Sequence, residues 1–314
     1  MLQVAGLRLQ KNEKTITEKS EQRLAIRKIK KLKIMDKKLV DYLTVLLIVL
    51  FLAIMYYPAF IWMWERWHAP DTNYSHGILI PIVSLFLLYS RKERLKQIQI
   101  KPEGSGIIFV CLAILVHITG NMINFPFASA FSFIIMLIGI VLFLFGIKIL
   151  KAVKFEILFL LFMIPAPLML ISNLTIRMKL FAAGIATNCL SVMGLKAVRE
   201  GSMIRMGHSF LEIEAPCSGL RSLISLLAFG AAFAYLTKHK FWKKVVLFAT
   251  ALPIALIANA GRIVLLGWVS EVYGMQAAQG WVHDFSGFLL FFFAACAMIA
   301  VNSILITQKI DEQK

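Results

Sequence analysis

The chain has 314 residues, of which 59% are hydrophobic and only 16% are charged, and its formal net charge is +17. Soluble domains carry roughly 25% charged residues, so this composition excludes an ordinary soluble domain and indicates a membrane protein. The positive charge favours a topology signal and contact with anionic lipid over nucleic-acid binding, because most of it lies in the N-terminal tail and in short connections.

Residues 1–40 form a basic tail that carries 12 of the 34 Lys and Arg residues, with Leu and Ile scattered among them. This pattern is typical of a surface-lying helix or of partial disorder. The apolar run that follows is too long and starts too far from Met1 to be the core of a cleaved secretion signal, so we expect it to remain as an anchor. The expected organisation is a cytoplasmic tail over 1–40, a transmembrane domain over 41–308 and a short cytoplasmic tail over 309–314.

About eight apolar segments follow the tail, and each is near the roughly 20 residues that a spanning helix needs. Backbone in lipid must satisfy its own hydrogen bonds, so such runs indicate helices, and the expected fold is an all-α polytopic membrane protein. Pro165 and Pro167 interrupt the fifth segment. The predicted spans are 42–64, 74–90, 106–124, 127–147, 155–172, 217–236, 245–268 and 285–306.

Basic residues alternate between the connections and predict the orientation of these spans. They gather at 91–101, 148–154 and 238–244, in addition to the N-terminal tail. Both termini are therefore expected in the cytoplasm, in a plasma or inner membrane protein. The connections poor in basic residues, and hence outward, are 65–73, 124–127, 173–216 and 269–284.

The outward stretch 173–216 has mixed periodicity. Its first part, up to Val192, repeats apolar residues at helical spacing and predicts an interfacial helix on the outer leaflet. Residues 202–206 and 209–213 alternate in character around Gly207-His208 and predict a short β-hairpin. The hairpin is either a roof over a site or a surface ornament.

Cys217 lies where this hairpin leads into the sixth predicted span. In the first turn of a helix, free backbone N–H groups and the dipole favour an anion, so the position would lower the pKa of a thiol toward its nucleophilic form. Pro216 suits a helix start, and Gly219 would allow close approach of another backbone or of a substrate. The alternative is a buried structural thiol.

Arg262 and Asn259 belong to Asn259-Ala260-Gly261-Arg262 near the outer end of the seventh predicted span. An arginine there is costly in lipid and tends to face a protein interior or a wet cavity. Its fork of donors suits a carbonyl oxygen that becomes negative, and Asn259 lies one turn away on the same face, where it can orient the fork. The alternative is an arginine that snorkels to the interface.

His283 lies at the outer entry to the eighth predicted span. Imidazole, with an unperturbed pKa of about 6.5, suits a group that takes a proton from a thiol and returns one to a leaving amine. A lone interfacial histidine is more often inert, but a thiol, a guanidinium and an imidazole on one face together favour acyl transfer.

Other residues could join this site. Arg221 follows Cys217 by four residues and could support a thiolate, as a rival to Arg262. His76 and His208 could also reach the site, but a zinc site with Cys217 and His283 lacks the usual ligand spacings, so no metal or other cofactor is expected. Ser218 and Ser286 do not lie in a Gly-x-Ser-x-Gly nucleophile motif.

These motifs resemble, in order and place, those of the exosortase/archaeosortase family of polytopic cysteine transpeptidases. The resemblance covers roughly 42–306. It rests on Cys217-Ser218-Gly219 with Arg221, Asn259-x-x-Arg262, His283 with Gly287, Trp67 and Asp71 ahead of Tyr74-Ser75-His76-Gly77, and Ile164-Pro165-Ala166-Pro167.

The resemblance implies an extracytoplasmic enzyme that cleaves the C-terminal sorting signal of exported membrane-anchored proteins. Such a signal consists of a short motif, often of the Pro-Glu-Pro type in bacteria, then an apolar helix and a basic tail. Catalysis is expected from Cys217, Arg262 and His283, with Ser218, Gly219, Arg221, Asn259 and His76 in supporting or substrate-binding roles. A thioester on Cys217 would pass to an acceptor or, in proteolysis, to water. The rival classes are a transporter and a non-catalytic membrane scaffold.

Overall fold

The structure is a computed structural model that describes residues 39–40, 42–69, 73–207, 209–212, 219–279 and 281–311. The predictions for the basic tail over 1–38 and for Asp71 lie outside these residues. The chain divides into two compact units, Met1–Tyr57 and Pro58–Lys314. The larger unit holds every motif discussed below.

The first predicted span, 42–64, is not one uninterrupted helix. The first unit contains a helix over Tyr42–Met55, and a second helix, α2, covers Tyr57–His68. The physical reason is Pro58, which has no N–H to donate and whose ring collides with the carbonyl of Ile54 in a continuous helix.

The helices after α2 agree closely with the second to fourth predicted spans. They are η1 (Ser75–Ile78) with α3 (Leu79–Ser90), the short α4 (Lys92–Lys96), α5 (Gly106–Met122) and α6 (Pro126–Phe145). Glycine lets α5 and α6 pack closely, since a Cβ on Gly139 would lie 2.8 Å from the backbone nitrogen of Val110. In lipid the hydrophobic effect does not drive helices together, so close packing at small residues stabilises the helix pair instead.

The predicted fifth span, 155–172, is wrong in its position. The chain forms α7 (Ile147–Phe159) and the 3-10 turn η2 (Leu160–Met163), breaks at 164–167, and resumes as α8 (Leu168–Val192). Pro165 and Pro167 cause the break, because each lacks an N–H and restricts the residue before it. The interfacial helix predicted up to Val192 is therefore confirmed as a helix, and it begins at Leu168.

The predicted hairpin is confirmed and belongs to a slightly larger sheet. Strands β1 (Val198–Glu200), β2 (Met203–Arg205) and β3 (Phe210–Glu212) form an antiparallel sheet in that order. Ile204 on β2 pairs with Leu211 on β3. The sequence does not predict the first strand, because its three exposed residues carry no alternation to detect.

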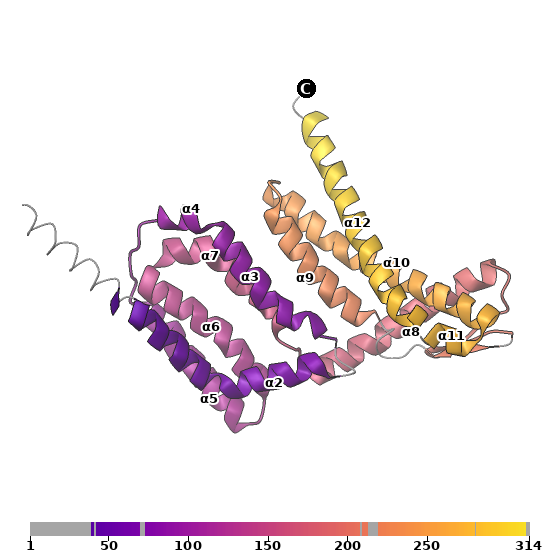
Figure 1. The fold of residues 1–314 in the computed structure, drawn as a ribbon, viewed down its shortest axis with the longest axis horizontal. Coiled ribbons are helices and arrows are strands. Elements are labelled where there is room, and N and C mark those ends of the chain that lie inside the picture. The colour runs from indigo at the N-terminus through magenta and orange to yellow at the C-terminus, as the bar shows by residue number, and fades with distance from the viewer. Residues whose placement is uncertain are drawn as a thin grey trace, which may run out of the picture. The chain divides into compact units, whose positions relative to one another are not determined.

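The last part of the chain forms a helical group of α9 (Leu220–Leu236), α10 (Phe241–Tyr273), the short α11 (Met275–Gln279) and α12 (Trp281–Asp311). Figure 1 shows α9, α10 and α12 side by side. Their shared core contains Leu226 of α9, Leu247 and Ala251 of α10, and Met298 of α12. All four side chains are almost fully buried, so these helices form one packed group.

The number of spans is only partly settled by length and composition. Within the described residues, three helices can each cross a membrane: Pro126–Phe145, Phe241–Tyr273 and Phe285–Ile306. A fourth span results if Tyr42–Met55 and Tyr57–His68 act together. Shorter apolar helices cover Ser75–Ser90, Gly106–Met122 and Leu220–Leu236. The chain is thus a mostly helical membrane protein, and the prediction of eight spans is not confirmed.

Candidate active site

Among the polar side chains buried on α10, the longest described helix, two belong to the Asn259-x-x-Arg262 motif. Asn259 is 2% exposed and Arg262 is 9% exposed. A charge removed from solvent is costly unless hydrogen bonds compensate it, so a buried arginine marks a polar interior. The alternative of a snorkelling arginine is wrong, because the guanidinium is enclosed by protein.

Asn259 connects α10 to the start of α9. Gly219, the N-cap residue of α9, has φ +79° and lies directly against the Asn259 side chain. A Cβ built on Gly219 would lie 2.6 Å from Asn259 Nδ2 and 2.7 Å from Cγ. The close approach expected at Gly219 is therefore made by the side chain of the Asn259 motif.

The predicted start of the sixth span needs a correction. The helix α9 begins at Leu220 rather than at 217. Gly219, the residue before it, has a left-handed backbone that does not continue a right-handed helix. The prediction that Cys217 lies in the first turn of this helix concerns a residue outside the described part of the chain and stays a prediction. Cys217 and Ser218 themselves lie outside the described residues.

Arg262 connects α10 to the start of α12. Its Nε donates a hydrogen bond of 3.0 Å to Ser286 Oγ. A Cβ built on Gly287 would lie 3.7 Å from Arg262 Nη2, so the guanidinium rests beside both residues. Described residues of all three sequence motifs thus meet where the first turns of α9 and α12 lie against the middle of α10. His283 belongs to α12, but its side chain lies outside the described part of the chain.

The small sheet is firmly attached beside this meeting point. Ile204 and Leu211 of the sheet pack in one core with Leu190 of α8 and with Ile263 and Leu266 of α10. Since Ile263 directly follows Arg262, the sheet lies next to the buried arginine. The packing attaches the sheet to α8 and α10, and its role as a roof over a site stays a prediction.

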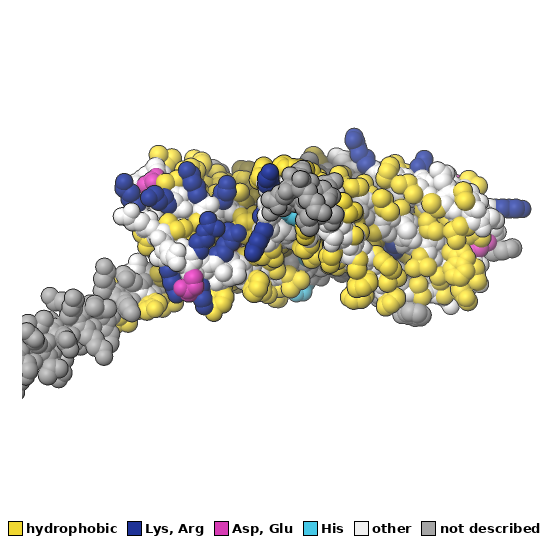
Figure 2. All heavy atoms as spheres, turned by 90° about the horizontal axis from the view of Figure 1, so that it is seen from above, with side chains coloured by type: hydrophobic (Ala, Val, Ile, Leu, Met, Phe, Trp, Pro, Cys, Tyr) yellow, Lys and Arg dark blue, Asp and Glu magenta, His cyan; other side chains and the backbone are white. Residues whose placement is uncertain are grey.

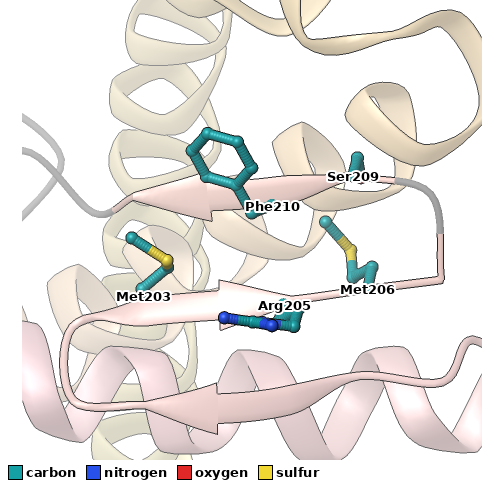
Figure 3. A pocket seen from close by; sticks show the side chains of 5 residues that line it. All are labelled: Met203, Arg205, Met206, Ser209 and Phe210. Carbon is teal, nitrogen blue, oxygen red and sulfur yellow. The ribbon is translucent and has the colours of Figure 1, made fainter.

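A polar contact also holds the sheet to α10. Ser209 Oγ, at the start of β3, donates a hydrogen bond of 2.7 Å to Glu271 Oε2. On the sheet itself, an open pocket of about 460 Å³ is lined by Met203, Arg205, Met206, Ser209 and Phe210 (Figure 3). Arg205 and Phe210 are exposed there, so the sheet presents both a cation and an aromatic ring.

His76 contacts α9 from the other side. Its Nδ1 shares a hydrogen bond of 3.0 Å with Ser225 Oγ. Ser225 lies six residues after Gly219, or about 9 Å along the helix axis. Arg221, half-buried in the first turn of α9, precedes Ser225 by four residues and shares its helix face. His76 therefore braces α9 below its start.

The other features of the family resemblance gather around His76. The Trp67 indole packs against Gly77, and its Nε1 donates a hydrogen bond of 2.8 Å to the carbonyl of Met163. The Tyr74 ring stacks on the His76 ring, with centroids 5.9 Å apart. The segment before Pro165 thus lies beside the start of α3, where it supports His76. Of the four residues considered for zinc, only His76 has a described side chain.

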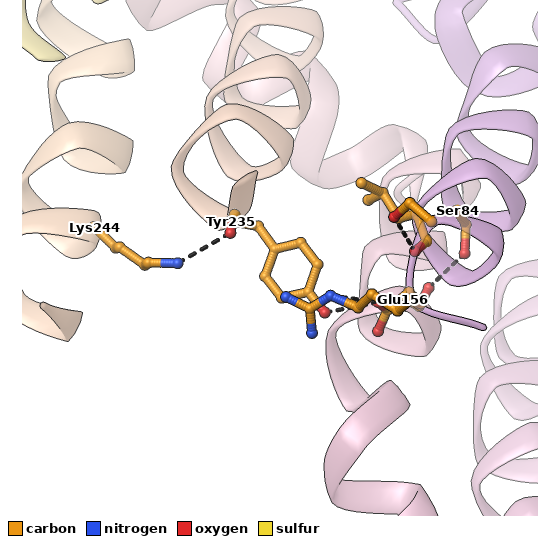
Figure 4. A network of polar contacts seen from close by, with 7 residues as sticks. Ser84, Glu156, Tyr235 and Lys244 are labelled. Carbon is orange, nitrogen blue, oxygen red and sulfur yellow. Dashed lines mark hydrogen bonds and ion pairs between the residues drawn. The ribbon is translucent and has the colours of Figure 1, made fainter. Parts of the chain in front are cut away.

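The opposite ends of these helices carry a second polar cluster (Figure 4). Tyr235 Oη, at the end of α9, donates a hydrogen bond of 2.7 Å to Glu156 Oε1 on α7. The Arg91 guanidinium lies 4.2 Å from the Tyr235 ring centre, and Lys244 Nζ donates to the Tyr235 carbonyl at 3.0 Å. Ser84 Oγ donates to the Glu156 carbonyl at 2.8 Å. This cluster joins α3 and α7 to α9 and α10.

The two polar ends are separated by about the thickness of a bilayer core. Arg262 follows Lys244 by 18 residues on α10, a rise of about 27 Å, against about 30 Å for the hydrocarbon core. Lys and Arg side chains gather over α4 and α7 (Figure 2). The buried motif residues near the starts of α9 and α12 lie away from these basic connections.

Sequence reasoning misses the roles of three residues that the contacts bring out. Ser286, considered above only as a nucleophile, lies three residues after His283 and one before Gly287, on the face that meets Arg262. Ser225 follows Arg221 by one helical turn, which is the signal that it shares the face of the motif. The sequence gives no signal that Glu156 is buried in a polar cluster, because a carboxylate near three lysines of α7 resembles ordinary surface charge.

Comparison with known protein families identifies the class of protein. The family model described as transmembrane exosortase (Exosortase_EpsH) matches residues 62–300. The match covers well over half of the chain, and the chain belongs to the transmembrane exosortase family. No match was found among curated proteins or among solved structures. The resemblance drawn from the motifs is confirmed, and with it the membrane character of the chain.

Proposed function

We propose that this chain is a membrane-embedded cysteine transpeptidase that cleaves the C-terminal sorting signal of exported proteins. One observation carries the proposal: Gly219, Asn259, Arg262 and Ser286, from three motifs far apart in the sequence, meet where the first turns of α9 and α12 pack against α10. A transporter more often places such groups at mid-bilayer. A scaffold has no need for a buried guanidinium at this place.

The chain geometry keeps Cys217 and His283 close to this meeting point. Cys217 precedes Gly219 by two residues, which span at most about 7 Å. His283 precedes Ser286 by three residues on α12, or about one helical turn on the same face. A sulfur and an imidazole can therefore both reach the surroundings of Arg262, and this supports their assignment as catalytic residues.

The proposed reaction has two halves. The Cys217 thiolate attacks the carbonyl carbon of the scissile peptide, and Arg262 stabilises the oxyanion that forms. Collapse of this intermediate breaks the C–N bond, and His283 gives a proton to the departing amine, which leaves a thioester on Cys217. An acceptor nucleophile then attacks the thioester, loses a proton to His283 and restores the thiolate. Water in the acceptor's place gives proteolysis.

The remaining site residues act by positioning. Asn259 fixes the approach of Gly219 and so of the segment that carries Cys217 and Ser218. Ser286 holds one edge of the Arg262 fork through Nε and so orients the guanidinium. Arg221 adds positive charge near the thiolate. His76 braces the same helix through Ser225.

The site is assigned to the outer face of a plasma or inner membrane, with both termini in the cytoplasm. The assignment rests on the basic connections at the opposite helix ends and on the positive-inside rule. The substrates are exported proteins anchored by a C-terminal apolar helix with a basic tail. Their helix would lie in lipid beside α9, α10 and α12, with its outer end at the site. No cofactor takes part in the proposed reaction.

The test is co-expression of the full chain with an exported protein that carries such a C-terminal signal. Cys217→Ala should abolish the change in substrate size, while Cys111→Ala, at an exposed thiol of α5, should leave it unchanged. Hydroxylamine, which cleaves thioesters, should release substrate that is held on the unmodified chain. If the Cys217→Ala variant processes the substrate as well as the unmodified chain does, the proposal is wrong.

A further inference from the structure

A pocket of about 910 Å³ lies between α3, α4, α6 and α7, away from the candidate active site. Its walls are apolar, and its floor includes Leu137, Val141 and Val153. The volume falls at the upper end of the roughly 300–1,000 Å³ typical of sites for small organic ligands. None of these residues belongs to the proposed catalytic machinery.

The pocket opens beside exposed apolar side chains of α3. Leu85 and Tyr89 of α3, which line its edge, are each 65% exposed, and both lie on an apolar helix. Exposed large apolar residues on a helix of membrane-spanning composition contact acyl chains rather than water. An occupant that enters from this side is therefore largely apolar.

Positive charge marks one end of the pocket. Lys92 and Lys96 line it at the helix α4, where their spacing of four residues places both on one face. Lys92 Nζ donates to Tyr89 Oη at 2.7 Å, and Lys96 Nζ contacts Glu93 Oε1 at 2.8 Å. Contacts of this kind between exposed groups are weak and readily exchanged for a stronger anion.

Glu156 also lines the pocket, but its carboxylate is engaged elsewhere. Its Oε1 accepts the hydrogen bond of Tyr235 and lies 4.0 Å from Arg91 Nε. With Glu156 beside Arg91 and Glu93 beside Lys96, the polar end keeps an excess of positive charge. The polar end therefore favours an anion.

We propose that this pocket binds an anionic phospholipid, with an acyl chain between α3, α6 and α7 and the phosphate at Lys92 and Lys96. The combination of an apolar slot and a basic rim between helices is the general pattern for such head groups. The apolar helix of a protein substrate fits less well, because its basic tail would meet the same two lysines. The proposal stands independently of the transpeptidase chemistry.

The test uses the full chain in vesicles of phosphatidylcholine doped with a phosphatidylglycerol that carries a photoreactive acyl chain. After irradiation, mass spectrometry should find the lipid on peptides of α3, α6 or α7. Lys92→Gln with Lys96→Gln should reduce labelling several-fold. The matched control, Lys238→Gln with Lys240→Gln, removes the same charge from lysines outside the pocket and should leave labelling unchanged.

Two further variants keep the test decisive. Val141→Trp, which fills the slot, should also reduce labelling, and Lys92→Arg with Lys96→Arg should retain it. Equal labelling by a photoreactive phosphatidylcholine would overturn the proposal, since it would show a non-specific annulus of lipid. Insensitivity to both the lysine and the Val141 changes would overturn it as well, as would competition by a substrate's apolar helix.

Discussion

Gly219 and Asn259 are in direct contact, although 40 positions separate them in the sequence. The space that a Cβ of residue 219 needs is taken by the Asn259 amide, and the backbone there has φ +79°. The contact locks the segment that follows Cys217 onto the helix that carries Arg262. Any side chain at 219 must therefore disturb both motifs.

Gly219→Ala should reduce substrate processing roughly tenfold or more. Adopting the left-handed conformation costs alanine about 1–2 kcal/mol, the collision with Asn259 adds to this, and about 1.4 kcal/mol is already tenfold in rate. The measurement is the rate of processing of a co-expressed substrate. Gly261→Ala is the matched control, because a Cβ there meets nothing within 4 Å. Equal activity of the two variants would contradict the proposed contact.

Arg262→Lys should lower the rate of thioester formation by about 10²–10³, the usual effect of removing one oxyanion donor. Lysine keeps the charge but loses the planar fork that bonds Ser286 and the developing oxyanion together. Single-turnover cleavage in detergent measures this rate. Ser286→Ala should have a smaller effect, since it removes a bond that positions the fork and keeps the guanidinium itself. Normal turnover by the Arg262→Lys variant would rule out the oxyanion role.

Tyr235→Phe should destabilise the helical group without affecting the chemistry of the site. Loss of the hydroxyl leaves the Glu156 carboxylate, 3% exposed, without its 2.7 Å donor, at a cost of about 1–3 kcal/mol. The free energy of unfolding of the solubilised protein is the quantity to measure. Tyr89→Phe removes an equivalent hydroxyl that bonds only exposed Lys92 and should change little. An equal loss of unfolding free energy in both variants would show that the cluster in Figure 4 does not stabilise the packing of these helices.

Ser209→Ala should loosen the sheet from α10. The hydroxyl bonds a carboxylate, Glu271, and hydrogen bonds to charged groups contribute about 1.5–3 kcal/mol. Hydrogen exchange at the amides of β2 and β3 should become faster. Arg205→Ala, which breaks an exposed ion pair with Glu200, is the control and should leave the exchange unchanged.

The orientation of the chain can be tested with two new cysteines in a background without native thiols. Glu200→Cys on the sheet should react with a membrane-impermeant maleimide added to intact cells, because we assign the sheet to the outer face. Ser105→Cys, before α5, should react only after the membrane is opened. Both residues are exposed in the structure, so accessibility to the reagent depends on the side of the membrane. The reverse pattern would invert the proposed topology.

Much of the local structure could be predicted, because it depends on features that are local in the chain. Continuous apolar runs predict α3, α5, α6, α9, α10 and α12 to within a few residues, except where α10 and α12 extend beyond lipid-like sequence. The hairpin is visible as alternation around Gly207. The interruption at Pro165 is also visible, but the position of the break does not follow from it, since an apolar run continues on both sides.

The sequence by itself determined that this is a helical membrane protein of the exosortase class, because composition, charge alternation and motif order need no knowledge of contacts. Only the tertiary structure decided which residues serve each motif: Asn259 meets Gly219, Arg262 bonds Ser286, and Tyr235 bonds Glu156. The physical reason is that a side chain's partner depends on helix rotation and packing between distant segments. Periodicity identifies the face on which a residue lies, but it does not identify the residue opposite.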